Sequence, residues 1–116
     1  MEDKEARLCA LGIDVRPTLK RFYGDYDLLV DMLHEFVQED MAEGMPAACA
    51  GGDLGELERI AHALKGTSAN LGLVELSALC NDVVQAVRAG KAEGLGEKVD
   101  MAVGCYRSVR AGIAAL

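Results

Sequence analysis

The chain has 116 residues, enough to bury one modest core, and its formal net charge is −7. We expect no binding to nucleic acid, because that requires clustered Lys and Arg to neutralise phosphates. No apolar run approaches the ~20 residues of a membrane span, and the first residues lack the basic start and apolar centre of a signal peptide. These features predict a cytoplasmic protein without direct membrane contact.

Four cysteines and two histidines are the residues from which a metal site would have to be built. The cysteines stand at positions 9, 49, 80 and 105, far apart and without a CxxC pair. Zinc sites need ligands closely paired in sequence, and disulfide frameworks belong to secreted chains. We therefore expect reduced thiols, some of them packed in the core, and no metal site.

The N-terminal part of the chain predicts two short helices and one long one. Mixed charge with leucines in the first dozen residues indicates a short helix, and Pro17 is typical of the first turn of a second. From Tyr26 the apolar residues recur at i, i+3 and i+4, which predicts an amphipathic helix to about Glu43. Pro46 cannot donate a backbone hydrogen bond, so the helix should kink or stop there.

Three further amphipathic segments follow, marked off by glycines. The expected helices run over residues 54–71, from about 76 to 90, and from 95 to about 113. Asp53 is the expected N-cap of the first. With the helix after Tyr26, these segments can bury their apolar stripes only against each other. The sequence therefore predicts an all-α fold, an antiparallel four-helix bundle with one or two short N-terminal helices, in a single domain over residues 1–116.

His62 stands out on the helix expected over residues 54–71. At 100° per residue it lies about 150° from the centre of the apolar stripe, so it should point to solvent. Gly66, one turn later, is a glycine inside an exposed helix, which costs ~1 kcal/mol relative to alanine. Close approach by another molecule would explain that choice. Because Ala63 and Ala69 are also small, the imidazole would stand on a low platform that a partner can reach.

Lys65 follows His62 by three residues and lies on the neighbouring ridge. A neutral imidazole is a nucleophile near pH 7, and a histidine that accepts a phosphoryl group gains negative charge that a nearby ammonium can offset. The phosphorus–nitrogen bond is labile, so the group can be passed on. The residues expected to contact the partner are Arg59, Ala63, Gly66 and Ala69.

The segment from Ala61 to Cys80, AHALKGTSANLGLVELSALC, resembles the signature of histidine-containing phosphotransfer (HPt) domains, in outline AHxLKGxxxxLGxxxLxxxC. Upstream, GGDLGELERI is similar to the usual Gly-Asp start of this helix. The resemblance covers about residues 12–90, with its motif core at about 53–90, and the last helix agrees in kind.

The resemblance implies a four-helix bundle that acts in a two-component signalling phosphorelay. The family's histidine takes phosphate from an aspartate on one receiver domain and gives it to another, so response-regulator receivers or a hybrid sensor histidine kinase are the expected partners. By position, the resemblance makes His62 the phosphoryl acceptor, Lys65 the neighbouring cation and Gly66 the clearance glycine. It implies a phosphoryl carrier rather than an enzyme, without a cofactor of its own, because the receiver supplies the magnesium.

Val84 departs from the family pattern. Many members carry Glu or Gln at this place on the facing helix. A polar contact that steadies the imidazole would then be absent, or supplied by the neighbouring Gln85 or Asp82.

Two other functions compete with the relay. The first is a bundle that binds signalling partners without transferring phosphate, and the Val84 departure is its only support in the sequence. The second is a hydrolase or transferase using His62 as general base, but the chain shows no convergent carboxylate, nucleophile or Gly-rich phosphate loop. His34, off its apolar stripe, is expected to be a plain surface histidine. Ser68 should hydrogen-bond back within its helix, and Asn70 is expected either to cap the helix end or to meet the partner.

Overall fold

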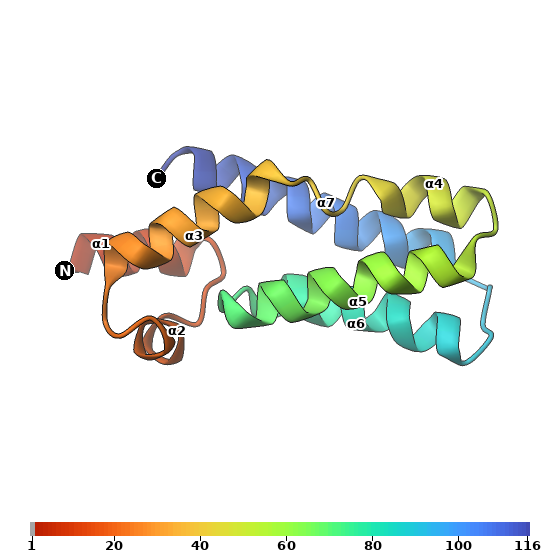
Figure 1. The fold of residues 1–116 in the computed structure, drawn as a ribbon, viewed down its shortest axis with the longest axis horizontal. Helices are drawn as coiled ribbons and strands as arrows, with labels where there is room; N and C mark the ends of the chain where they lie inside the picture. Colours follow the sequence, from red (N-terminus) through yellow and green to blue (C-terminus); the bar gives the residue numbers. More distant parts are fainter. Residues whose placement is uncertain (1) are drawn as a thin grey trace.

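Seven helices make up the fold in this computed structural model, which describes residues 2–116, with side chains from residue 3 onward (Figure 1). They are α1 (Glu2–Ala10), α2 (Val15–Arg21), α3 (Tyr26–Gln38), α4 (Gly44–Ala50), α5 (Leu54–Asn70), α6 (Val74–Arg88) and α7 (Leu95–Ala114). Over these residues the fold contains no strand, so the predicted all-α class is confirmed.

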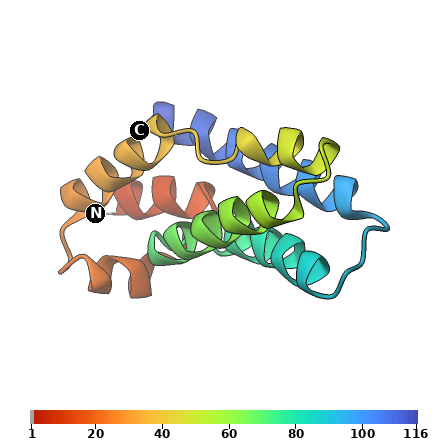
Figure 2. The same ribbon diagram turned by 45° about the vertical axis from the view of Figure 1, so that its right-hand side comes forward.

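The predicted four-helix arrangement is present, with one of its four rods broken in two. α3 and α4 follow each other along one side of α7, and α5 lies beside α6 in the opposite direction (Figures 1 and 2). α4 packs on both α5 and α7, which closes the bundle. The molecule is 46 Å long and 22 by 18 Å across, and α1 and α2 cover one end of it. Between residues 2 and 116, no helix is both long and apolar enough to cross a membrane.

The long helix expected to reach about Glu43 ends earlier, and this prediction was wrong. α3 stops at Gln38, and Asp40 has a left-handed backbone with φ 45°. A new helix begins at Gly44 and places Pro46 in its first turn, where the missing N–H has no helical acceptor to lose. Met45 in the same turn is fully buried. The helix is therefore interrupted before Pro46. A short linker precedes α4 and allows Met45, in the first turn of α4, to be buried in the core.

Side chains of α7 hold both ends of this break. Arg110 pairs with Asp40 at 3.4 Å, and Arg107 pairs with Glu43 at 3.3 Å. On the same helix, the buried Tyr106 ring meets Phe36 of α3 edge to face, with 5.6 Å between the ring centres. The two parts of the first rod are thus held by the same helix.

The other three long helices agree with their predicted bounds to within about two residues, because their apolar stripes have a regular helical period. The stripes meet in one core, whose largest fully buried side chains include Leu29, Leu33, Leu57, Leu64, Leu76, Val83 and Ile113. All four cysteines are free thiols, and Cys80 is fully buried among these side chains.

Candidate functional site

α5 presents His62 to solvent. The N-terminus of α5 is capped by Asp53, whose Oδ1 accepts a hydrogen bond from the Glu56 amide over 3.1 Å, as predicted. The buried residues of the helix are Leu57, Ala61, Leu64 and Ser68. His62 lies away from this stripe and is exposed, which confirms the orientation expected from the helical period.

Small residues surround the imidazole on the outer wall of α5. Ala63, Gly66 and Ala69 are all exposed. A methyl group built on Gly66 would meet nothing within 4 Å, apart from its own helix. No tight contact inside the protein therefore requires a glycine at this place. The wall around His62 is low and open, as the sequence predicts.

Lys65 is half-buried on the same helix, beside the seam with α6. Its carbonyl oxygen accepts hydrogen bonds from the Ser68 and Ser77 hydroxyls, each over 3.1 Å. The bond from Ser77 ties the backbone one turn after His62 to α6. Among the side chains that the structure describes, the ion pairs are made by arginines, so the Lys65 ammonium remains available to a partner.

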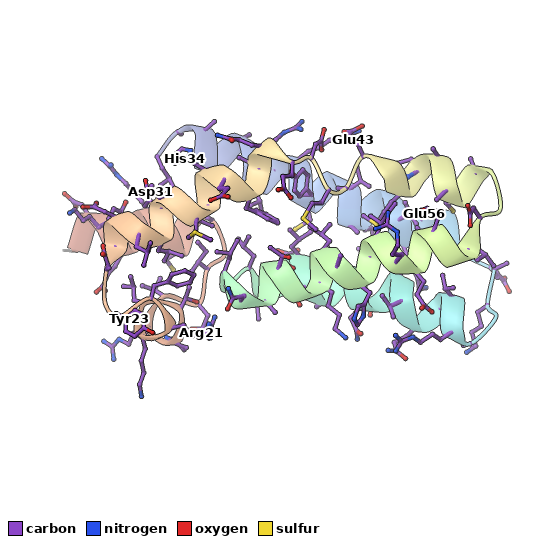
Figure 3. All side chains as sticks on the ribbon, viewed as in Figure 1. Arg21, Tyr23, Asp31, His34, Glu43 and Glu56 are labelled. Atoms are coloured by element: carbon purple, nitrogen blue, oxygen red, sulfur yellow. The ribbon has the colours of Figure 1, made fainter. Side chains whose placement is uncertain are left out.

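Arg59 is exposed on the outer wall of α5 and pairs with Glu56 of the same helix, with Nε 2.7 Å from the carboxylate (Figure 3). An exposed i, i+3 pair contributes little to stability and exchanges easily for another partner. Of the residues predicted to bind a partner, the structure thus places Arg59, Ala63, Gly66 and Ala69 on the face that carries His62.

Two contacts between α5 and α6 frame the histidine, and neither was predicted from the sequence. Ser77 donates to the Lys65 carbonyl, and Arg88 pairs with Glu58 at 3.3 Å. His62 lies between Glu58 and Lys65 in the sequence of α5, so it sits beside this seam. Such contacts depend on how two helices are aligned, which no local spacing reveals.

Val84 is fully buried on α6 and contributes no polar group. The two substitutes considered for it, Asp82 and Gln85, are both exposed, and both border a surface hollow together with Lys98 of α7. Gln85 donates instead to Asn81, with 3.4 Å between Nε2 and Oδ1. Asn81 is a half-buried polar residue of α6 that sequence reasoning did not consider.

Three further residues near the site or of the same type were singled out in the sequence, namely Ser68, Asn70 and His34. The Ser68 hydroxyl donates to the Leu64 carbonyl over 2.6 Å, so back-bonding within the helix is confirmed. Asn70 is the last residue of α5, and its carbonyl accepts a hydrogen bond from Arg21 of α2 over 3.2 Å (Figure 3). His34 is half-buried on α3, in a different rod from His62 (Figure 3).

His62 is exposed and lines none of the main surface hollows. Four surface hollows of about 210 to 730 Å³ are lined by other residues. Within residues 2–116, no three His, Cys, Asp or Glu side chains are grouped so that they could hold a metal ion. An exposed nucleophile on a convex helix can react only with a group that another molecule brings within its own active site.

This chain belongs to the Hpt domain family, whose family model matches residues 28–116, from the first turn of α3 to the end of the chain. A search of curated proteins and a search of solved structures gave no significant match. The resemblance found in the sequence is thereby confirmed and extends over α7. α1 and α2 lie outside the matched residues.

Membership of the family defines a general role. Hpt domains carry phosphoryl groups on histidine in two-component systems, where they interact with receiver and kinase domains. The match does not depend on a single residue, because it spans all four rods of the bundle.

Proposed function

We propose that this protein relays a phosphoryl group between receiver aspartates through His62. The observation that carries the proposal is an exposed imidazole on an open wall of small residues in a chain of the Hpt family. Because His62 is exposed on an open helix face, it needs a partner that supplies the rest of the catalytic site. A response-regulator receiver or the receiver of a hybrid sensor kinase is such a partner, and we place the exchange in the cytoplasm.

The transfer is a displacement at phosphorus. The lone pair of one imidazole nitrogen attacks the phosphorus of the receiver's aspartyl phosphate, the P–N bond forms, and the P–O bond to the aspartate breaks. The carboxylate leaves with the electron pair, while the other ring nitrogen keeps its proton. A second receiver aspartate reverses these steps.

Lys65 and the small residues would support the transfer in different ways. The ammonium of Lys65 offsets the charge of the transferring oxygens. Gly66, flanked by Ala63 and Ala69, lets the receiver approach the ring, and Arg59 exchanges Glu56 for an acidic group of the receiver. The magnesium ion that such transfers use would be held by the receiver, so this chain acts as a carrier without a cofactor.

The test is phosphotransfer from a panel of phosphorylated receiver domains, read by intact mass. Wild type should gain an acid-labile phosphate, and His62→Gln should gain none while keeping its helical content. His34→Gln, at the second histidine, is the matched control and should transfer normally. Transfer to His62→Gln would contradict the assignment. If no receiver phosphorylates the folded wild type, the chain is instead a bundle that binds signalling partners without transferring phosphate.

A further inference from the structure

The outer face of α7 points away from the bundle core and carries exposed apolar surface. α3, α4 and α6 pack against α7, whose buried residues form one stripe along its inner face (Figure 1). The exposed residues of the outer face are Glu97, Asp100, Met101, Gly104, Arg107, Ser108 and Ala111. Among the described residues, Met101 is the most exposed large aliphatic side chain, at 60 %. Burial of this side chain by another molecule would remove apolar surface from water.

A surface hollow of about 480 Å³ lies beside Met101, on the side of α7 that faces α6 and α1. Its lining includes Met101, Gly104, Cys105 and Ser108 of α7, Leu76 and Leu79 of α6, and Leu11 at the end of α1. Met101 borders the hollow but stays largely exposed, so it does not fill it. The hollow therefore has room for an apolar side chain from another molecule.

Two ridges run along the outer face, and each joins residues that are two turns apart. Asp100 and Arg107 form one ridge, and Met101 and Ser108 form the other. Residues seven positions apart differ by only about 20° around a helix and by about 10 Å along it. The first ridge thus has a carboxylate at one end and a guanidinium at the other. The second has a thioether at one end and the edge of the hollow at the other.

These ridges complement themselves under a two-fold rotation. A second copy of α7, laid antiparallel with the two-fold axis near Gly104, brings Asp100 opposite Arg107 of that copy and Met101 opposite its Ser108. The same two contacts form again with the copies exchanged, as in any isologous interface. Each Met101 then enters the hollow of the other copy, and each carboxylate meets a guanidinium.

The charges favour a second copy over a different protein. Acidic Glu97 and Asp100 lie in the first half of the face, and Arg107 lies in the second half. A partner surface of a single charge would meet like charge at one end, whereas an antiparallel copy meets opposite charge at both ends. Among the described side chains, Asp100 is in no ion pair. Arg107 pairs with Glu43, but its exposed guanidinium has further N–H donors to offer.

We propose that this protein forms a two-fold dimer through the outer face of α7. One helix from each copy makes a smaller interface than permanent dimers have, so the dimer is weak and depends on concentration. α5 packs on α6 and α4, so the wall that carries His62 belongs to another side of the bundle and stays open in the dimer. The dimer therefore presents two carrier histidines, and its formation does not depend on phosphotransfer.

Sedimentation equilibrium of the full chain tests the dimer directly. From about 10 μM to about 1 mM, the average mass should rise from that of one chain toward that of two. Met101→Asp, which places a charge at the hollow, should stay monomeric over the same range. Met32→Asp is the matched control, because Met32 is an exposed methionine of α3, and this variant should dimerise as wild type does.

Charge reversal identifies the face and its antiparallel direction. Asp100→Arg and Arg107→Asp each place like charges opposite each other twice in a homodimer, so each should raise the dissociation constant by about tenfold or more. An equimolar mixture of the two variants restores both opposite-charge pairs, and it should dimerise as wild type does. Glu43→Ala removes the partner of Arg107 within the chain and should still dimerise. Circular dichroism verifies that each variant is folded.

The outcomes that overturn this inference are separate from those that overturn the relay. A wild-type mass that stays at one chain up to the highest concentration refutes the dimer and leaves the outer face of α7 to a different molecule. A dimer that survives Met101→Asp, or that the mixture of folded charge-reversed variants fails to restore, places the interface elsewhere and refutes the proposal. Failure of phosphotransfer affects none of these masses.

Discussion

Gly72 lies against Thr18, so that a Cβ atom on Gly72 would overlap the Thr18 hydroxyl. Gly72 also has φ +77°, a left-handed conformation that only glycine adopts without strain. It lies in the middle of the connection from α5 to α6, and its carbonyl accepts a hydrogen bond from the Asp14 amide over 3.0 Å. The end of the helix that carries His62 is thereby joined to the N-terminal helices.

Gly72→Ala should therefore lower the free energy of unfolding by about 3 kcal/mol, as the sum of the left-handed backbone and an overpacked contact. Urea denaturation followed by circular dichroism measures this. Gly90→Ala is the control, because Gly90 has φ +69° but nothing within 4 Å of an added Cβ, so it should lose only about 1 kcal/mol. Equal losses in the two variants would show that the contact with Thr18 contributes nothing.

Features that depend on neighbours in the sequence could be predicted. Asp53 was expected as an N-cap, and its side chain accepts a hydrogen bond from the amide three residues later. The exposure of His62 follows from the period of its own helix. These features need no knowledge of how the helices pack.

Features that depend on two separate segments could not be predicted. The early end of α3 follows from the burial of Met45 and from the Asp40–Arg110 pair, which connects residues far apart in the chain. The contacts of Ser77 with Lys65 and of Arg88 with Glu58 depend on the alignment of α5 with α6. A shift of one residue along α6 would turn a different side chain to the seam, and nothing in the local sequence sets that shift.

Replacing Gly66 should stabilise the free protein when the new side chain is small, but should hinder its complex with a receiver when the new side chain is large. Gly66→Ala should raise the free energy of unfolding by about 1 kcal/mol, because the added methyl meets nothing within 4 Å and alanine favours the helix. Gly66→Leu should fold but transfer phosphate poorly, since the larger side chain stands where the receiver approaches.

Gly104→Ala is the matched control for Gly66. It lies in the interior of α7 with nothing within 4 Å of an added Cβ, so it should gain similar stability and transfer normally. Denaturation curves and transfer rates of the three variants separate folding from docking. Normal transfer by Gly66→Leu would disprove the clearance role of this glycine.

Cys80 should make the protein less stable at alkaline pH. Burial, with a smaller contribution from Cys105, raises the pKa of its thiol from 9.0 to about 12. The unfolded chain then loses this proton at a lower pH than the folded protein. The contribution to stability is complete below pH 9 and is lost as the pH rises toward 12, by up to about 1.4 kcal/mol per pH unit.

Denaturation at several pH values from 7 to 11 measures this contribution. Cys80→Ala should be less stable at neutral pH, because it leaves a small cavity in the core, but its stability should fall less steeply above pH 9. Cys9→Ala, at an exposed thiol, should keep the wild-type pH dependence. Parallel curves for wild type and Cys80→Ala would contradict the prediction.

Arg21 should stabilise the end of α5 without taking part in phosphotransfer. Its guanidinium donates to the carbonyls of Ala69 and Asn70, each over 3.2 Å, at the C-terminus of the helix, where backbone oxygens lack partners (Figure 3). Because these bonds are exposed, Arg21→Ala should cost only about 1 kcal/mol in the free energy of unfolding. Arg21→Lys keeps the charge but loses the planar guanidinium, so its free energy of unfolding should lie between those of wild type and Arg21→Ala. Lys20→Ala, at the preceding exposed position, is the control and should change stability little.

His62 lies about 10 Å along the helix from Ala69, so the rate of transfer to Arg21→Ala should match wild type under conditions where both are folded. A loss of transfer in the folded variant would instead show that α2 forms part of the receiver-binding surface.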